Sequence, residues 1–421
     1  MLRSFRFIPL TSYISLVSNH PRLIGFGFVM TLASSFGQTY FIGVFGPEIQ
    51  TEFDLSHTEW GTIYMIGTVL SAALLTWSGA FIDQFSLQRY TLFVLALLTV
   101  SCMFMLITAS MLMLIVAIFL LRQSGQSLAM HIATTTMSRY FESDRGRAIS
   151  LSSMGATVGG SLLPLIAVLG ISMVGWRWTY VGAAIICGCL VVPIVLWLLK
   201  GHSNRHQAHI EKLRSETNHS MQKKKSWNRT QVLRDRRFYL LLPGFIATDI
   251  VVTAMFFHHI NLADAKGWSH TWITGNYVIY SIVTLFVTLL TGPLIDRYCA
   301  IRIAPFVLLP IAAALLVIGL SDSMWIVVFY MFLLGINSGL SYPTMSALWP
   351  EMYGVEFIGA IRSLATPVAL FGSALGPIIM GGLMDLNVNV DAICMAFASY
   401  CLLATGLIFI AVRQKPRINL D

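Results

Sequence analysis

Two short stretches, Gly79-Ala-Phe-Ile-Asp83 and Gly292-Pro-Leu-Ile-Asp296, repeat one pattern in the two halves of the chain. Each copy ends a long apolar run and is followed by arginine, and the copies lie 213 residues apart. The same offset carries Gly146 to Gly359, which both fall between the fourth and fifth apolar runs of their halves. A constant offset over several features indicates an internal duplication, so we expect two similar halves.

The composition of the chain decides its class. Its 421 residues are 56% hydrophobic and 11% charged, and the mean hydropathy is +0.74. A soluble domain carries about a quarter charged residues, so this chain cannot cover a water-soluble surface of its size. The six cysteines show no metal-type spacing and read as small apolar residues. These observations exclude a soluble enzyme, a disordered chain and a disulfide-rich secreted domain, and they predict a polytopic membrane protein.

Apolar runs of about 20 residues are long enough to cross a membrane as helices. The sequence therefore predicts an all-α membrane protein with twelve transmembrane helices in two pseudo-symmetric six-helix bundles. The expected spans are 23–45, 60–81, 91–109, 111–134, 149–170, 178–199, 239–262, 272–295, 303–320, 324–347, 363–384 and 392–412. The expected domains are a cytoplasmic tail 1–22, a bundle 23–199, a basic cytoplasmic linker 200–237, a bundle 238–412 and a tail 413–421.

Lysine and arginine counting gives the orientation, since basic loops stay in the cytoplasm. With both termini inside, only Arg177 and Lys266 fall on the outer side, and Arg122 lies within a span. The net charge of +8 is then mostly a matter of topology, and no nucleic-acid partner is expected. The linker is interpreted as a solvated loop, with contact to anionic membrane lipid as the alternative. We expect an integral protein of a bacterial cytoplasmic (inner) membrane that acts as a monomer.

The repeated Gly-x3-Asp pattern resembles the loop signature of the major facilitator superfamily. Arg122-Gln-Ser-Gly125, in the fourth span, resembles the Arg-x-x-Gly element of the same superfamily. Arg139-Tyr-Phe141, Arg145-Gly-Arg-Ala148 and the glycines Gly155 and Gly159 are similar to its monocarboxylate transporter and oxalate/formate antiporter branch. The resemblance implies the major facilitator fold, in which spans 1, 4, 7 and 10 line a central cavity.

Charged residues deep in the membrane are expensive and mark functional sites by default. Arg122 and Asp249 each lie about ten residues inside a span, which is roughly 15 Å deep at 1.5 Å per residue. In the implied fold they face each other between the halves. We expect Arg122 to attract an anionic substrate, and Asp249 to carry a coupling proton or to pair with Arg122 when the site is empty. The alternative is helix packing, with each charge satisfied by backbone or amide groups.

Three uncharged residues are further candidates for the substrate site: Gln126, one turn after Arg122, Gln38 in span 1 and Asn337 in span 10. For each of them an interhelical hydrogen bond is an equal alternative. His258 and His259 close span 7 and are interpreted as interfacial histidines.

The repeated turns carry the gating residues that the resemblance implies, Asp83 with Arg89 and Asp296 with Arg297. A carboxylate there can meet the positive end of a neighbouring helix. We expect these contacts to break and re-form as the halves rock. No metal site, cofactor or catalytic residue is expected.

The leading interpretation is a secondary transporter that moves a small organic anion, such as a carboxylate, by alternating access, with proton coupling or by exchange. The alternative within transporters is a proton-coupled exporter of amphipathic compounds. A sensor built on the same fold would need a signalling domain larger than 200–237. An enzyme would need a nucleophile motif such as Gly-x-Ser-x-Gly, which the sequence lacks, and no nucleotide-binding loop points to ATP as the driving force.

Overall fold

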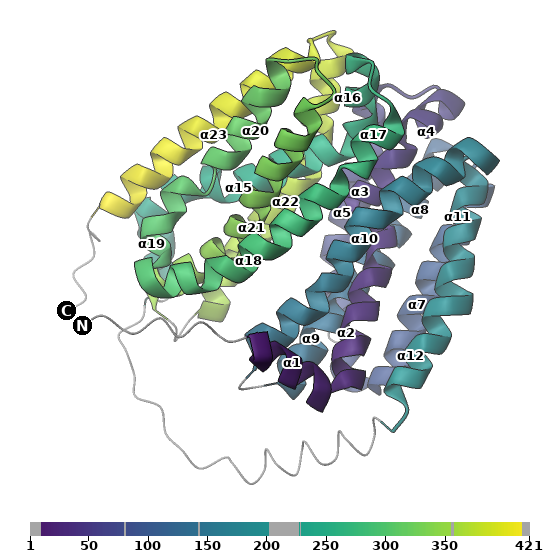
Figure 1. The fold of residues 1–421 in the computed structure, drawn as a ribbon, viewed down its shortest axis with the longest axis horizontal. Helices are drawn as coiled ribbons and strands as arrows, with labels where there is room; N and C mark the ends of the chain where they lie inside the picture. The colour runs from purple at the N-terminus through teal and green to yellow at the C-terminus, as the bar shows by residue number, and fades with distance from the viewer. Residues whose placement is uncertain are drawn as a thin grey trace. The chain divides into compact units, whose positions relative to one another are not determined.

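The computed structural model describes residues 10–79, 81–141, 144–201, 227, 229–354 and 358–414, and the regular elements among them are all helices (Figure 1). In chain order they are α1 Leu10–Asn19, α2 Pro21–Ser34, η1 Ser35–Gly37, α3 Thr39–Ile42, η2 Gly43–Phe45, α4 Gly46–Phe53, α5 His57–Ser78, α6 Phe81–Gln84, α7 Leu87–Phe104, η3 Met105–Ile107, α8 Met111–Leu121, η4 Arg122–Ala129, α9 Met130–Tyr140, α10 Arg145–Val174, α11 Trp176–Ile185, η5 Ile186–Val191, α12 Val192–Leu199, α14 Arg229–Arg234, α15 Arg236–Phe257, α16 His259–Lys266, α17 His270–Gly275, α18 Tyr277–Tyr298, α19 Ala300–Ile303, η6 Ala304–Phe306, α20 Leu309–Gly319, α21 Ile326–Tyr353, α22 Ile358–Asp385 and α23 Val390–Arg413. The predicted linker 200–237 lies mostly outside the described residues.

The expectation of an all-α membrane protein is confirmed. Within the described ranges, ten helical stretches are long and apolar enough to cross a membrane, and the bent pair Pro21–Gly37 and Thr39–Phe53 is an eleventh candidate. The first span expected at 23–45 falls within this bent pair, in which the chain bends by 44° at Gln38. There the backbone is extended, with φ −86° and ψ 155°, which interrupts the helical hydrogen bonds beside Gly37.

The residue contacts divide the chain into two compact units. Unit 1 contains Met1–Gln38, Leu70–Gly159 and Met173–Gln222, and unit 2 contains Thr39–Val69, Gly160–Ser172 and Lys223–Asp421. Two segments from the first half of the sequence therefore belong to unit 2. The two bundles expected at 23–199 and 238–412 have other boundaries than these two units, and they stay a prediction.

Small residues let the long helices of unit 2 approach closely. Helices α18 and α21 run side by side (Figure 1). A Cβ on Gly335 would lie 2.8 Å from the Tyr280 carbonyl oxygen, and a Cβ on Gly339 would lie 2.7 Å from Val287 Cβ. The hydroxyl of Thr284 also donates to the Gly335 carbonyl at 3.3 Å. Glycine at helix contacts with threonine hydrogen bonds is typical of packing in lipid, where the hydrophobic effect does not drive helices together.

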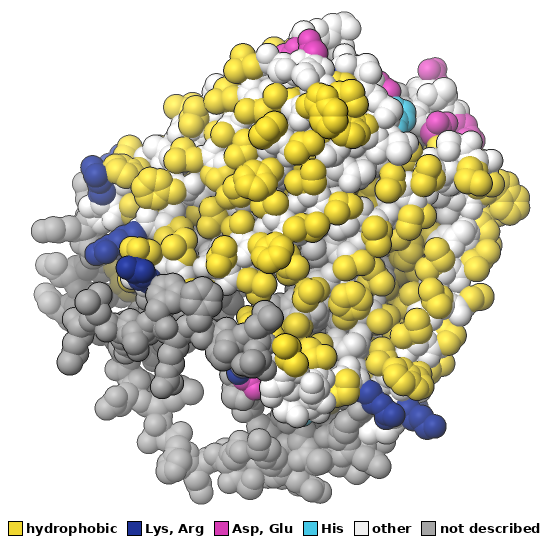
Figure 2. All heavy atoms as spheres, in the orientation of Figure 1, with side chains coloured by type: hydrophobic (Ala, Val, Ile, Leu, Met, Phe, Trp, Pro, Cys, Tyr) yellow, Lys and Arg dark blue, Asp and Glu magenta, His cyan; other side chains and the backbone are white. Residues whose placement is uncertain are grey.

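Apolar side chains cover the flanks of the helices. Leu112, Phe286, Phe329 and Leu403 are all more than half exposed, which would promote aggregation in water. On the face drawn in Figure 2, yellow apolar side chains spread over the helices, and charged side chains gather near helix ends. This distribution matches helices whose sides contact lipid.

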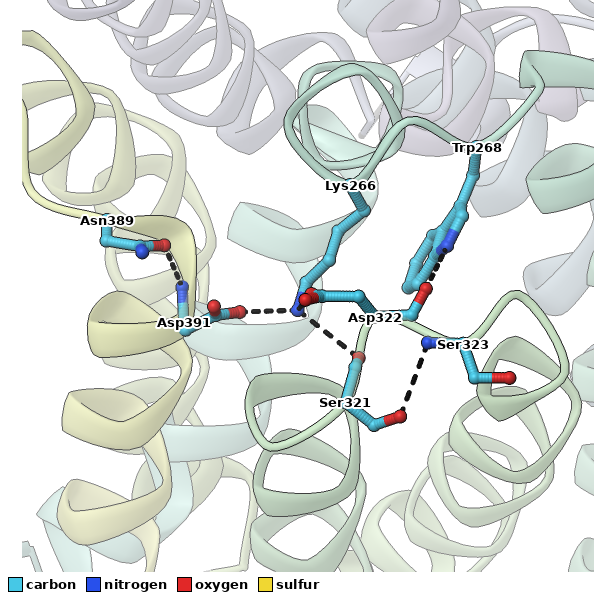
Figure 3. A network of polar contacts seen from close by, with 7 residues as sticks. All are labelled: Lys266, Trp268, Ser321, Asp322, Ser323, Asn389 and Asp391. Atoms are coloured by element: carbon cyan, nitrogen blue, oxygen red, sulfur yellow. Dashed lines mark hydrogen bonds and ion pairs between the residues drawn. The ribbon is translucent and has the colours of Figure 1, made fainter.

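A buried lysine joins three segments at one end of unit 2 (Figure 3). The Lys266 side chain is 3% exposed, and its Nζ lies 2.7 Å from Asp322 Oδ1 and 2.5 Å from Asp391 Oδ1. Trp268 Nε1 donates to the Asp322 carbonyl at 2.8 Å. Burial alone would lower the pKa of Lys266, but the hydrogen bonds and charges of the two aspartates raise it above its ordinary value. The lysine is therefore charged at neutral pH and connects α16, α23 and the loop before α21.

We expect Lys266→Met to lower the free energy of unfolding by about 1.5–3 kcal/mol, because hydrogen bonds to charged groups contribute that much. Thermal unfolding of the detergent-solubilised protein measures the effect. Arg234→Gln, at an exposed arginine, is the matched control and should change stability little. Because the folded-state pKa of Lys266 is raised, the stabilisation should persist from neutral pH up to the lysine range and fall above it. Equal unfolding temperatures for the two variants would contradict a supporting role for Lys266.

Candidate functional site

A cavity of about 460 Å³ opens within unit 2 between α15, α21 and α22. This volume is in the range of sites for small molecules. Its lining residues are Gly244, Phe245, Thr248, Asp249, Val252, Thr253, Ser338, Ser341, Tyr342, Met345, Ser346, Trp349 and Ala369. Among these described lining residues, Asp249 is the charged one, and none is a lysine, arginine or histidine.

Asp249 projects into this cavity from the middle of α15. Its side chain is half-buried, and its carboxylate has no hydrogen bond or ion pair with any residue that the structure describes. The backbone carbonyl of Asp249 accepts a hydrogen bond from Thr253 Oγ1 at 2.5 Å. A carboxylate at membrane depth normally pairs with another group, and among the described residues the Asp249 carboxylate has no such partner.

Hydroxyl groups on α15 and α21 line the same cavity as Asp249. Thr248 Oγ1 and Ser341 Oγ lie 3.2 Å apart, and Tyr280 donates to Ser338 Oγ at 3.0 Å. Because a hydroxyl both donates and accepts, this wall can bind either kind of polar group on a solute.

Aromatic rings complete the lining of the cavity. Phe245 and Trp349 meet edge to face with their ring centroids 5.6 Å apart. Tyr342 is 82% exposed and adds a third ring with a polar tip. Rings of this kind can bind a flat apolar body or, through their faces, a cation.

Helix periodicity explains which side chains of α21 reach the cavity. Ser338, Ser341, Met345 and Trp349 recur at three- and four-residue steps and share one face of α21. The predicted candidate Asn337 is one position away, which turns it by about 100°. It is fully buried and donates from Nδ2 to the Val307 carbonyl at 2.9 Å. The recurrence of serine at this spacing in span 10 was a usable signal that the sequence analysis missed.

The second charged candidate, Arg122, lies in unit 1 at a close helix crossing. It is 1% exposed and donates from Nη1 to the Gly37 carbonyl at 3.3 Å. A Cβ on Gly125 would come within 2.7 Å of Gly37 Cα, and one on Gly37 within 2.9 Å of the Gln126 backbone nitrogen. The crossing therefore brings Arg122 and the backbone of Gln126 close to Gly37, and the substrate-binding role of Arg122, Gln126 and Gln38 stays a prediction.

Arg122 also begins η4, an eight-residue π-helical stretch between α8 and α9. π-Helical turns are rare in proteins, and many of those that occur lie at functional sites. Since Arg122 and Asp249 belong to different units, the expectation that they face each other stays a prediction.

The predicted gating residues are only partly described. The side chains of Asp83 and Asp296 lie outside the described residues. Arg89 is exposed in the first turn of α7, and Arg297 is exposed with its guanidinium 5.1 Å from the Tyr298 ring. The two copies differ in their backbone, because α5 ends at Ser78 whereas α18 continues through Asp296.

Two further expectations can be compared with the described residues. His258 and His259 are 0% and 1% exposed and pack inside unit 2, while their position at the depth of the membrane interface stays a prediction. Within the described ranges, no group of three or more histidine, cysteine, aspartate or glutamate side chains could hold a metal ion.

Comparison with known proteins identifies a family signature over almost the whole chain. A sequence model described as the Major Facilitator Superfamily matches residues 27–377 and 262–420. The fold is similar to that of a bacterial homologue of the human lysosomal transporter Spinster, in an inward-facing and occupied conformation, at 17% identity and a TM-score of 0.67, over 97% of this chain and 99% of that one. It is also similar to the nucleoside transporter NupG, at 12% identity and a TM-score of 0.70, over 93% of this chain and 100% of that one. No curated protein sequence matches the chain.

We expect Gly125→Ala to destabilise unit 1 by about 1–3 kcal/mol, because the added methyl group has no room beside Gly37. Gly182→Ala is the control, since its Cβ would meet no atom within 4 Å. Thermal unfolding in detergent compares the two. A Gly125→Ala variant as stable as the control would show that the crossing tolerates a wider separation.

Proposed function

Because this chain belongs to the major facilitator superfamily, we propose that it moves a small organic solute across the membrane by alternating access and binds that solute in the Asp249 cavity. Transporters of this superfamily hold their substrate near the middle of the membrane and change access by rocking of two repeats. The membrane-spanning helices and the family match support a transporter rather than an enzyme.

The observation that carries the proposal is a carboxylate on the wall of a membrane-depth cavity that has no partner among the described residues. A solute with an amine or hydroxyl donors can bind Asp249 and the hydroxyls of Ser338 and Ser341, while its apolar or aromatic part lies against Phe245 and Trp349. This chemistry favours amphipathic compounds, the alternative of the sequence analysis. When the cavity is exposed in turn to each side, the same carboxyl can exchange a proton, which would couple transport to a proton gradient.

An organic anion, such as a carboxylate, is the second candidate for the cargo. Arg122 supports it, since a cation at membrane depth beside a π-helical stretch is a potential anion site. The lining of the Asp249 cavity does not favour it, because a carboxylate repels an anion. We therefore place amphipathic solutes first and anions second.

The basic loops support one orientation of the chain in the membrane. We propose an inner-membrane protein with both termini and the basic linker in the cytoplasm, gated on that side by the Asp83 and Asp296 turns, and active as a monomer in contact with lipid.

We expect Asp249→Asn to reduce transport driven by a pH gradient by about tenfold or more, because asparagine keeps the shape but cannot bind or release the proton. Uptake into proteoliposomes is measured with the compound that most raises the unfolding temperature in a screen of carboxylates, amino acids, nucleosides and lipophilic cations. Asp264→Asn, at a more exposed aspartate paired with His270, is the control and should transport normally. Normal gradient-driven transport by Asp249→Asn would rule out the proposed role.

The same screen separates the two solute classes. We expect lipophilic cations or amines to stabilise the wild-type protein and to lose that effect in Asp249→Asn, because the carboxylate is their charged partner. If carboxylates stabilise the protein instead, and Arg122→Gln removes their effect, then the organic-anion proposal is correct and the amphipathic one is not.

A further inference from the structure

Within unit 2, the segment 39–69 from the first half of the sequence packs against helices α15, α16 and α22 from the second half. Three kinds of contact hold it there: a carboxylate on a helix end, a set of glycines at backbone contacts, and a buried aromatic stack. Because the proposed transport by alternating access needs the two halves to separate, a contact between them would have to open during the cycle.

The carboxylate of Asp385, the last residue of α22, binds the first turn of α5. Asp385 Oδ1 accepts from the His57 backbone nitrogen at 2.9 Å, and Oδ2 accepts from the Thr58 backbone nitrogen at 2.7 Å. The first amides of a helix have no partner within the helix and carry a partial positive charge. One acid therefore satisfies two such donors across the contact, and water can replace it when the segments separate.

Side-chain amides continue this polar contact on the other side of His57. Its Nδ1 lies 2.8 Å from Gln50 Nε2 and 3.0 Å from Asn261 Nδ2. Gln50 belongs to α4 and Asn261 to α16, so the bond between His57 and Asn261 also joins the two halves of the sequence.

Glycines bring the backbones together around Asp385. A Cβ on Gly381 would lie 2.5 Å from the His57 carbonyl oxygen, and a Cβ on Gly61 would lie 2.9 Å from Ile378 Cα. On the first span, a Cβ on Gly43 would lie 2.7 Å from the Phe256 carbonyl oxygen. No side chain of any size fits at these three positions without moving the backbones apart.

Beneath the polar layer, aromatic rings close the contact. Trp60 stacks on Phe257 with ring centroids 5.3 Å apart, and Tyr64 lies 4.6 Å from the same ring. All three side chains are 0% exposed. Such a stack excludes water while the segments remain together.

We propose that this contact is a gate of the transport cycle and that its closed form depends on the Asp385 carboxylate and on the absence of side chains at Gly43, Gly61 and Gly381. The inference rests on the proposed transport mechanism. It assigns gating to residues on the side opposite the repeated turns, where the sequence analysis expected none.

The accessibility of a cavity residue tests the gate without any substrate. Tyr342→Cys serves as the reporter in a background where the two exposed cysteines, Cys189 and Cys299, are replaced by serine. A membrane-impermeant maleimide is added to either side of sealed, oriented vesicles, and the labelling rate is measured on each side.

Gly61→Ala and Gly381→Ala should each raise labelling from the Asp385 side by about tenfold, since overpacking destabilises only the closed form. Asp385→Asn should act in the same direction without adding an atom, which keeps the test valid if a glycine variant does not fold. Gly382→Ala is the matched control on the same helix, because its Cβ would lie 3.7 Å from Thr58 Oγ1, an ordinary contact.

Two results would overturn the gate. If folded Gly61→Ala, Gly381→Ala and Asp385→Asn label like Gly382→Ala, the contact is permanent packing. If a bifunctional maleimide joining His57→Cys to Asp385→Cys leaves transport unchanged, the segments never separate. Failure of transport in the wild-type protein with every compound screened would instead count against the proposed function, because the labelling assay needs no cargo.

Discussion

The absence of water in the lipid core is the constraint on which this architecture depends. A backbone there must satisfy its hydrogen bonds internally, so the chain crosses as helices. Helices that cannot use the hydrophobic effect for association approach through small residues, as Gly335 and Gly339 do against α18. The same constraint makes each departure from regular helix informative. The extended backbone at Gln38 and the π-helical stretch from Arg122 lie on the two segments that cross where Gly37 and Gly125 allow backbone contact.

The two charged side chains at membrane depth, Arg122 and Asp249, differ in burial and in hydrogen bonding. Arg122 is almost completely buried and donates at least one hydrogen bond to a backbone carbonyl of a neighbouring helix. Asp249 is half-buried on a cavity wall, among hydroxyls and aromatic rings, with no partner among the described residues. An enclosed, hydrogen-bonded cation holds helices in place, whereas an open carboxylate can exchange protons or bind cargo. This difference is why the Asp249 cavity, and not the arginine, carries the proposed solute site.

A carboxylate that binds the N-terminal end of a helix occurs both in the sequence-based prediction and in the structure. A carboxylate at the positive end of a helix was expected at the repeated turns, at Asp83 and Asp296. The described residues show such a contact elsewhere, where Asp385 binds the first amides of α5. The interaction is strong enough to hold two segments and is exchangeable with water, which suits a contact that forms and breaks during a cycle.

Run length, charge placement and the 213-residue repeat were sufficient to predict an all-helical membrane protein of this superfamily, because lipid imposes the same length and polarity on every crossing helix. They also singled out Asp249, since an acid inside an apolar run is visible without coordinates. Tertiary packing decided the rest. Whether Asn337 or its neighbour Ser338 faces the cavity depends on the rotation of α21, and one residue turns a side chain by about 100°. The partners of Asp385, more than 300 residues away in sequence, follow from how segments pack in space, and no local pattern records that.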